Sequence, residues 1–168
     1  MEIRILTSED AKEWWGLRRQ ALESDPAAFS TSSDEHQQLS LEEVRNRLGA
    51  GTQSSFVVGA LEDGRLVGMA GFYREAGEKT RHKGRIWGVY VAPEKRQGGI
   101  GRKLLQLLLQ RARAIDGLDQ IHLSVTTTQA AAAQLYRSMG FEPFGIEPRA
   151  LKIGGRYIDE EYMLLRLK

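Results

Sequence analysis

The N-terminal half of the chain changes between alternating and helical hydrophobic spacing, and each change marks a predicted element. Apolar and polar residues alternate at the start, and Thr7 or Ser8 then caps a helix. Ser40 and Glu43 form a capping box for a second helix, whereas the polar segment before them shows little periodicity. The pattern predicts a strand over residues 2–6, a helix carrying residues 11–22, a loop over 24–40, a helix over 40–49 and antiparallel strands over 55–61 and 66–74.

The C-terminal half continues with strands and helices that follow one another in turn. Pro93 closes a strand because proline cannot continue a β-ladder, and Gly117 and Gly140 are placed to end helices. The pattern predicts a strand over residues 85–91, helices over 101–115 and 130–139, and strands over 121–125, 141–146 and from 157 onward. The elements therefore follow in the order β-α-α-β-β-β-α-β-α-β-β.

The composition favours one globular domain over residues 1–168, because 41% hydrophobic residues can supply a single sizeable core. The 24 basic and 22 acidic residues nearly balance, which argues against nucleic acid as the main partner. No cysteine is present, so a disulfide framework, a thiolate zinc site and a cysteine nucleophile are excluded. No stretch approaches the roughly 18 apolar residues of a membrane span. We therefore expect a soluble, cytoplasmic protein without a membrane partner.

A glycine-rich segment, residues 96–101, lies between a predicted strand and a predicted helix and reads Arg-Gln-Gly-Gly-Ile-Gly. Glycines let the backbone approach a ligand closely, and the first N–H groups of the helix have no partner within it. Together with the helix dipole and the charges of Arg96, Arg102 and Lys103, these donors favour a phosphate or pyrophosphate. Glycines at such a place can also form only a tight turn.

Two common nucleotide-binding motifs are excluded by spacing. A Walker loop requires Gly-Lys-Ser/Thr, but Gly101 is followed by Arg102, Lys103 and Leu104. A dinucleotide fingerprint requires a third glycine at position 104 and a first strand that leads into the turn, whereas this turn follows the fourth predicted strand. The turn therefore belongs to neither class.

The segment around this turn resembles the pyrophosphate motif of the GNAT superfamily of acetyl-CoA-dependent N-acetyltransferases. That motif reads Arg/Gln-x-x-Gly-x-Gly/Ala after a strand ending Val-x-Pro, and residues 91–101 read Val-Ala-Pro-Glu-Lys-Arg-Gln-Gly-Gly-Ile-Gly. A second family signature, Asn-x-x-Ala-x-x-Leu-Tyr with a later Gly-Phe, is similar to residues 129–136 with Gly140 and Phe141. Gln129 stands where that signature has asparagine. The resemblance covers nearly the whole chain.

The resemblance implies an α/β (α+β) fold with a mixed, strongly twisted β-sheet flanked by helices, the acyl-CoA N-acyltransferase fold, and acetyl-CoA as co-substrate. The fourth and fifth strands would splay apart and admit the pantetheine arm, which the backbone of Val89 and Val91 would bind. The N–H groups that would hold the pyrophosphate, beside the charge of Arg96, are those of Gln97, Gly98, Gly99, Ile100, Gly101 and Arg102. Gln129 would contact the arm or would simply begin a helix.

Tyr136 is implied by the same resemblance as the general acid that protonates the leaving CoA thiolate, a role suited to a phenol that is protonated at neutral pH. Without the motif, a tyrosine on the apolar side of a helix is more commonly a core residue. The positions where some relatives carry a basic glutamate correspond to Arg85 and Ser124. The remaining candidates for the general base are His82, Glu75, Glu160 and Glu161.

We expect direct transfer of an acetyl group from acetyl-CoA to a primary amine, either a small molecule or a peptide, in a ternary complex. Acetylation of a peptide N-terminus or a protein lysine is the alternative, and a non-catalytic CoA-binding module is the alternative of another class. The aromatic residues that could line an acceptor pocket are Trp14, Trp15, Phe29, Tyr73, Trp87 and Tyr90. The three histidines lie far apart without paired-ligand spacing, so no metal site is expected. The chain could also form a homodimer.

Overall fold

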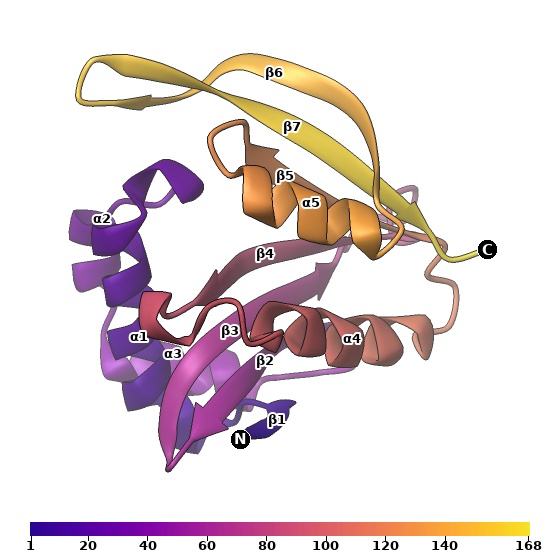
Figure 1. Ribbon diagram of the computed structural model, residues 1–168. Coiled ribbons are helices and arrows are strands. Elements are labelled where there is room, and N and C mark those ends of the chain that lie inside the picture. Colours follow the sequence, from indigo (N-terminus) through magenta and orange to yellow (C-terminus); the bar gives the residue numbers. More distant parts are fainter.

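The computed structural model describes the whole chain, Met1 to Lys168, as a twisted seven-stranded sheet with helices on both faces (Figure 1). The strands are β1 (Glu2–Ile5), β2 (Ser55–Glu62), β3 (Arg65–Arg74), β4 (Lys83–Val91), β5 (Gln120–Thr126), β6 (Glu142–Ile153) and β7 (Arg156–Arg166). The α-helices are α1 (Ala11–Ser24), α2 (Ser33–Gln37), α3 (Leu41–Gly49), α4 (Ile100–Arg113) and α5 (Ala130–Ser138). Single-turn 3-10 helices are η1 (Ser8–Asp10), η2 (Pro26–Ala28) and η3 (Pro93–Lys95). The predicted succession of strands and longer helices is confirmed.

The prediction of a loop over residues 24–40 is wrong in part, because this polar segment contains η2 and α2. Ser32 caps α2: its hydroxyl accepts a hydrogen bond from the Glu35 N–H, and the Glu35 carboxylate accepts one from the Ser32 N–H. This capping box satisfies N–H groups that so short a helix otherwise leaves unpaired. Buried His36 anchors α2 to α1, since its Nε2 lies 2.9 Å from the carbonyl oxygen of Trp15.

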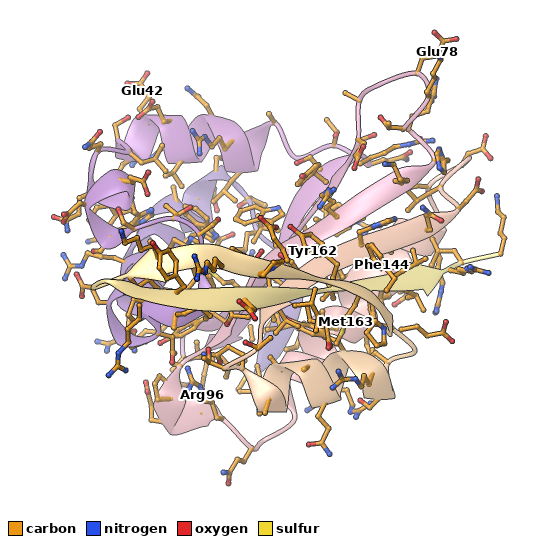
Figure 2. All side chains as sticks on the ribbon, turned by 90° about the horizontal axis from the view of Figure 1, so that it is seen from above. Glu42, Glu78, Arg96, Phe144, Tyr162 and Met163 are labelled. Atoms are coloured by element: carbon orange, nitrogen blue, oxygen red, sulfur yellow. The ribbon has the colours of Figure 1, made fainter.

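The hairpin of β6 and β7 is longer than the sequence pattern predicted. β6 continues to Ile153 instead of ending near residue 146, because its backbone pairs with β7 up to the final turn. The pairing is irregular between Glu147 and Leu151, which obscures the alternation that marks a strand. Figure 2 looks down on this hairpin, where Phe144 and Tyr162 lie with their ring centroids 6.1 Å apart.

Two hydrophobic cores lie on opposite faces of the sheet. One packs α4 and α5 against the sheet and includes Leu104, Leu105 and Leu108, each fully buried. The other packs α1 and α3 against the opposite face. Each fully buried side chain of this size contributes about 1.5–3 kcal/mol. Strand β4 sends Ile86 into the first core and Tyr90 into the second, so it is held from both sides.

Candidate active site

The sheet opens between β4 and β5, which are its one parallel pair of neighbours. Pairing joins residues 83–85 to residues 120–122, and beyond them the strands separate. Each strand keeps its outer partner, since β4 pairs with β3 and β5 pairs with β7. Backbone N–H and C=O groups that face the split have no neighbouring strand to bond, so an extended ligand can bind them. The splaying expected for the fourth and fifth strands is present.

A β-bulge in β4 shapes one edge of this split. Two residues of β4, Gly88 and Val89, oppose the single residue Ala70 of β3. Gly88 has a φ of 62°, in the left-handed region that glycine adopts without a Cβ clash. A bulge of this kind increases the local twist and turns backbone groups out of the ladder. The bulge therefore redirects β4 where the split begins.

Further along β4, the ladder turns the backbone groups of Val91 toward the split. The Ala92 N–H donates to the Val67 carbonyl at 2.9 Å, and Gly68 and Val91 form the adjacent pair. Pairs alternate between bonded and non-bonded in an antiparallel ladder, so Val91 points its N–H and C=O away from β3. The Val91 carbonyl accepts a hydrogen bond from Arg96 Nε at 2.9 Å, which leaves its N–H for a ligand.

A cavity of about 80 Å³ lies in the split, with the size of a few water molecules or one acetyl group. Its lining residues come from β4, β5, α5 and the η2 segment, and they are Ala28, Phe29, Ile86, Trp87, Gly88, Val89, Leu123, Ser124, Val125, Gln129, Ala132 and Tyr136. Three of the predicted site residues, Val89, Gln129 and Tyr136, therefore meet at one place. Gln129 is the N-cap of α5, and its side chain makes no capping hydrogen bond there.

Tyr136 lies on the buried side of α5, and 6% of it is exposed. Its ring packs edge-on against Phe141, with centroids 6.1 Å apart. Burial raises the pKa of the Tyr136 phenol above its ordinary value, because the charged phenolate is poorly solvated there. The hydroxyl therefore stays protonated at neutral pH. Tyr136 is therefore a core residue that also lines the cavity.

The glycine-rich turn leads into α4 and leaves the start of that helix open. Gln97 and Gly99 adopt left-handed conformations, with φ of 66° and 74°. Gly99 is the N-cap, and the first turn of α4 has neither a side-chain cap nor an acidic residue. The first N–H groups are therefore free to bind an anion, with the helix dipole in support. A Cβ on Gly101 would lie 3.2 Å from Leu135 Cδ2, so glycine permits close packing of α4 on α5.

The two arginines of the turn direct their hydrogen bonds to protein groups. Arg96 Nη2 donates to the Asp25 carboxylate at 2.6 Å while its Nε binds Val91, so Arg96 ties the turn to the end of α1. Arg102 Nη2 donates to the Ser138 hydroxyl at 2.8 Å, which ties the start of α4 to the end of α5. Their charges remain beside the turn, but both side chains also brace it.

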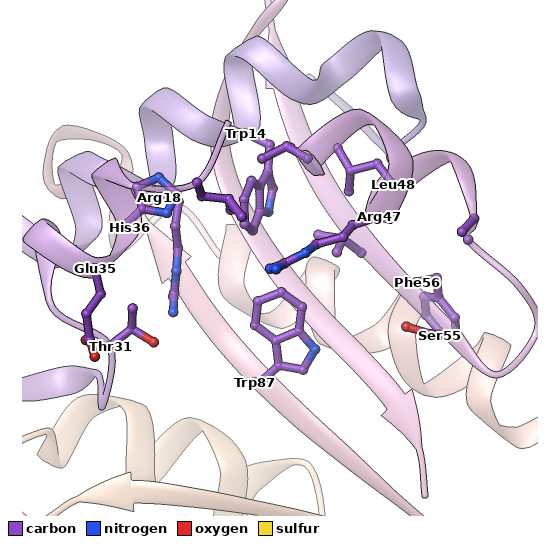
Figure 3. A pocket seen from close by; sticks show the side chains of 15 residues that line it. Trp14, Arg18, Thr31, Glu35, His36, Arg47, Leu48, Ser55, Phe56 and Trp87 are labelled. Carbon is purple, nitrogen blue, oxygen red and sulfur yellow. The ribbon is translucent and has the colours of Figure 1, made fainter. Parts of the chain in front are cut away.

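A second cavity, of about 550 Å³, lies beneath α1, α2 and α3 on the other side of Trp87 (Figure 3). It is lined by Trp14, Arg18, Thr31, Glu35, His36, Leu39, Val44, Arg47, Leu48, Ala50, Gly51, Ser55, Phe56, Val57 and Trp87. Trp87 lines both cavities, so the two spaces adjoin at this side chain. Of the aromatic residues proposed for an acceptor pocket, Trp14 and Trp87 line the larger cavity and Phe29 lines the smaller one. Trp15, Tyr73 and Tyr90 line neither.

Sequence reasoning missed Arg18, which reaches the larger cavity from α1. It stands four residues after Trp14 and four before Leu22 on the buried stripe of α1, where packing alone would favour an apolar residue. Arg18 is 8% exposed, and burial lowers its pKa to about 10, so it remains charged at neutral pH. Its guanidinium carbon lies 4.8 Å from the ring centroid of Phe29 and 5.8 Å from that of Trp87.

Two of the candidate bases are engaged as counter-ions. Glu75 forms ion pairs with Lys83 and Arg85 at 3.5 and 3.2 Å. Burial acts to raise the pKa of Glu75, but the hydrogen bond from Arg85 and the charge of Lys83 hold it below the ordinary value. Glu161 pairs with Arg137 at 2.5 Å. The Glu75 carboxylate is therefore stabilised in the charged form, which makes it a weak base, and the Glu161 carboxylate is engaged by Arg137.

Glu160 differs from these carboxylates because it pairs with no cation. Burial, followed by the charge of Glu147, raises the pKa of Glu160, although a hydrogen bond with Ser124 lowers it in part. Ser124 itself lines the small cavity. His82, in the connection before β4, lines neither cavity. Of the four candidates, Glu160 is thus the one that the fold connects to the acetyl-sized cavity.

The buried histidine of α2 and the histidine of β5 have separate partners. His36 lies against the Trp15 carbonyl, and His122 Nε2 lies 2.9 Å from the Gln120 side-chain amide. No group of three or more His, Cys, Asp or Glu side chains is arranged to hold a metal ion. No helix has both the length and the apolar character needed to cross a membrane.

A sheet that opens between two parallel strands, beside an uncapped glycine turn, defines an acyl-CoA N-acyltransferase fold. Solved structures agree with this class. A GNAT-family acetyltransferase from Streptococcus pneumoniae superposes with a TM-score of 0.89 and 27% identity, covering 98% of each chain. The protein YncA from Salmonella typhimurium, solved with its cofactor acetyl-CoA, has a TM-score of 0.81 and 25% identity, covering 100% of this chain and 94% of YncA.

Sequence comparison identifies the family. The model of the acetyltransferase (GNAT) family matches residues 12–141. The N-alpha-acetyltransferase RimI of Mycobacterium tuberculosis is 33% identical over 157 residues, which cover 91% of this chain and 85% of RimI. The chain therefore belongs to the GNAT acetyltransferase family, and it is an acyltransferase. The family resemblance drawn from residues 91–101 and 129–136 is confirmed.

Proposed function

We propose that this protein transfers an acetyl group from acetyl-CoA directly to a primary amine within a ternary complex. The meeting of three features at one small cavity supports this activity: the split between β4 and β5, the bulge at Gly88, and the protonated hydroxyl of Tyr136. Acetyl-CoA supplies an activated carbonyl when it is bound. The protein then needs only to hold two substrates in line and to move two protons.

The residues present fit acetyl-CoA as the donor. An extended chain of amide groups matches the unpaired strand edge at the split, where the backbone of Val89 and Val91 would hold the pantetheine arm. The N–H groups from Gln97 to Arg102 would hold the pyrophosphate, because no side chain caps them. Gln129 lines the acetyl-sized cavity with an uncommitted side chain, so it would contact the arm near the thioester.

Two residues would move the protons. Glu160, hydrogen-bonded to Ser124, would accept a proton from the amine directly or through one water, so that the nitrogen lone pair can attack the acetyl carbon. A C–N bond forms and the C–S bond breaks. Tyr136 would donate its phenolic proton to the departing sulfur. The raised pKa of Tyr136 does not prevent this transfer, because a thiolate formed in the same buried space also gains proton affinity.

A peptide N-terminus is a second candidate acceptor, and the similarity to RimI, an N-alpha-acetyltransferase, favours it. The larger cavity adjoins the small one at Trp87 and has room for the first residue of a peptide as well as for a small amine. Acetylation of a protein lysine would use the same approach. A non-catalytic CoA-binding module is disfavoured, because Tyr136 keeps its proton-donating group at the cavity.

Two measurements on the full chain test the proposal. Titration calorimetry with acetyl-CoA should show heat of binding, and saturating acetyl-CoA should raise the melting temperature by mass action. Release of free thiol, followed with a panel of primary amines, amino acids and short peptides, should identify at least one acceptor class. Binding without thiol release from any acceptor would support the non-catalytic module. The absence of both signals would contradict acetyl transfer altogether.

A homodimer and a cytoplasmic location stay predictions. The exposed apolar side chains of the β6–β7 hairpin are Phe144, Ile146 and Tyr157, each more than half exposed. A dimer interface on this hairpin would remove them from water. Light scattering after size-exclusion chromatography would measure the oligomeric state.

A further inference from the structure

Two buried side-chain nitrogens of this protein have no hydrogen-bond partner, and both belong to the larger cavity. They are Trp14 Nε1 and Arg18 Nη1. Trp14 is 6% exposed and Arg18 is 8% exposed, so bulk water does not solvate them freely. Burying a donor without an acceptor is costly, and burying an unpaired charge costs more. Such groups are expected where a ligand supplies the missing acceptor.

Arg18 stands at the boundary between the two cavities. A Cβ built on Gly88 would lie 3.3 Å from Arg18 Nη1, so the unpaired nitrogen faces the bulge of β4. Gly88 lines the small cavity that Tyr136 also lines. The rings of Phe29 and Trp87 flank the guanidinium. A group bound to Arg18 would therefore lie close to the place where the amine must react.

The charges around the larger cavity favour an anion. Arg47 extends into it from α3, on the side opposite Arg18 (Figure 3), and adds a second positive charge. The one carboxylate in the lining, that of Glu35, accepts a hydrogen bond from the Ser32 N–H at 2.7 Å as part of the α2 cap. Burial lowers the pKa of His36, so its ring is neutral at neutral pH. The cavity therefore offers positive charge and hydrogen-bond donors to a ligand.

The rest of the larger cavity is suited to an apolar group. Its wall includes Leu39, Val44, Leu48, Phe56 and Val57. A volume of about 550 Å³ holds an aliphatic or aromatic body of moderate size. The ligand that matches these walls has an anionic group near the small cavity and an apolar body that extends beneath α1, α2 and α3.

We infer that the larger cavity binds an amino-acid-like acceptor, in which a primary amine and an oxyanion, a carboxylate above all, lie a few bonds apart on an apolar body. Arg18 recognises the oxyanion through a charge-assisted hydrogen bond, and the indole N–H of Trp14 can donate to another acceptor atom of the ligand. The inference rests on the proposed acetyl transfer, because that reaction requires the amine to point from the larger cavity toward the smaller one. Arg18 is then a specificity-determining residue.

Matched acceptors and matched variants of the full chain test this role. L-Phenylalanine and L-leucine are each compared with their carboxamides, in which an NH2 group replaces one carboxylate oxygen and the negative charge is lost. The aminophosphonate analogue of phenylalanine separates recognition of a carboxylate from recognition of any oxyanion. Arg18→Met keeps an unbranched apolar stem without the charge, and Arg18→Lys keeps the charge. Arg19→Met is the control, because Arg19 is half exposed, pairs with Glu23 and does not line the cavity.

The wild type should prefer the acid to the carboxamide in kcat/KM by about 10- to 100-fold, the range expected for one charge-assisted hydrogen bond. Arg18→Met should abolish this preference, Arg18→Lys should retain part of it, and Arg19→Met should leave it unchanged. Without ligand, Arg18→Met should melt at the same or a higher temperature than the wild type, because it removes an unpaired buried charge. A lower melting temperature with the preference intact would make Arg18 a structural residue and overturn the inference.

The outcomes separate this inference from the proposed acetyl transfer. Equal rates on acids and carboxamides, or thiol release with peptides alone, would overturn the role of Arg18 and leave acetyl transfer intact. If no acceptor reacts although acetyl-CoA binds, the fluorescence of Trp14 and Trp87 shows whether an amino acid still binds in the larger cavity. A fluorescence change on titrating phenylalanine into the wild type, absent in Arg18→Met, supports the inference; no change in the wild type overturns it.

Discussion

The proposed donor side and the proposed acceptor side of this acyltransferase are built from different groups. The donor side, at the β4–β5 split and residues 96–102, presents mainly backbone: an uncapped helix start, a bulge at a glycine and free strand edges. The acceptor side presents side chains that arrive from α1, α2, α3, β2 and β4. Backbone donors do not depend on side-chain identity, whereas every lining residue of the acceptor side can change selectivity. A substitution on one side should therefore weaken binding of that side's substrate and leave binding of the other substrate unchanged.

The largest effect is expected from Gly98→Glu on the donor side. Gly98 needs no left-handed φ, and a Cβ there would meet only the Lys95 carbonyl oxygen, at an ordinary 3.7 Å. The fold should survive, while the new carboxylate opposes the pyrophosphate. Two like charges about 4 Å apart repel by about 4 kcal/mol at an effective dielectric of about 20, which is near 10³-fold in affinity. Calorimetry with acetyl-CoA measures this loss.

Gly145→Glu is the matched control for Gly98→Glu. Gly145 lies on β6, and a Cβ there would have nothing within 4 Å. Its variant should bind acetyl-CoA as the wild type does. If a folded Gly98→Glu protein binds acetyl-CoA with unchanged affinity, the phosphate site lies elsewhere. Residues 96–102 would then not belong to the donor side.

Tyr136→Phe should reduce the chemical step by about 10²-fold and leave acetyl-CoA affinity unchanged, because the proton matters in the transition state more than in the ground state. The fold should persist, since the ring keeps its contact with Phe141. Single-turnover acetyl transfer isolates this step from product release. Tyr157→Phe, which removes the hydroxyl of an exposed tyrosine that lines neither cavity, is the control. Equal single-turnover rates for Tyr136→Phe and wild type would leave Tyr136 a packing residue.

Glu160→Gln should have a smaller effect, about 10-fold in kcat/KM, because part of the amine can lose its proton to water before it binds. A general base must be deprotonated, so wild-type activity should rise as the pH passes through the raised pKa of Glu160. Glu160→Gln should remove this rising limb of the pH profile. The pH dependence of kcat at saturating amine, which the ionisation of the free amine does not affect, shows from pH 5 to 9 whether the limb disappears. Glu161→Gln, which loses only an ion pair with Arg137, should keep it. A limb that survives in Glu160→Gln would exclude this base.

Ser32→Ala should have the smallest effect on activity, and it should weaken binding of the acceptor alone. Loss of an N-cap costs about 1 kcal/mol, which lowers the melting temperature of a domain of this size by about 2–4 °C. Because α2 carries Glu35 and His36 to the larger cavity, KM for the acceptor should rise. Acetyl-CoA affinity, measured by calorimetry, should not change. A weaker affinity for acetyl-CoA would show that the two sides are coupled through α2.

Local patterns were sufficient to predict most of the elements. Hydrophobic periodicity predicted the strands and the longer helices, because the period of burial follows from backbone geometry. Short elements were harder to predict: α2 has five residues, too few for a period, although Ser32 and Glu35 form the same capping box that was found at Ser40 and Glu43. The far half of β6 was missed because its irregular pairing breaks the alternation.

The sequence by itself determined the glycine turn of the proposed donor side, because a glycine turn between a strand and a helix is a feature of contiguous residues. It also placed Tyr136 on the buried side of α5, by helical spacing. Only the tertiary structure decided the proposed acceptor side, because Arg18 and Trp87 are far apart in the chain and meet through packing of α1 on the sheet. The same holds for Glu160, whose approach to Ser124 depends on how β7 pairs with β5. Contacts between distant segments leave no period or motif in the sequence.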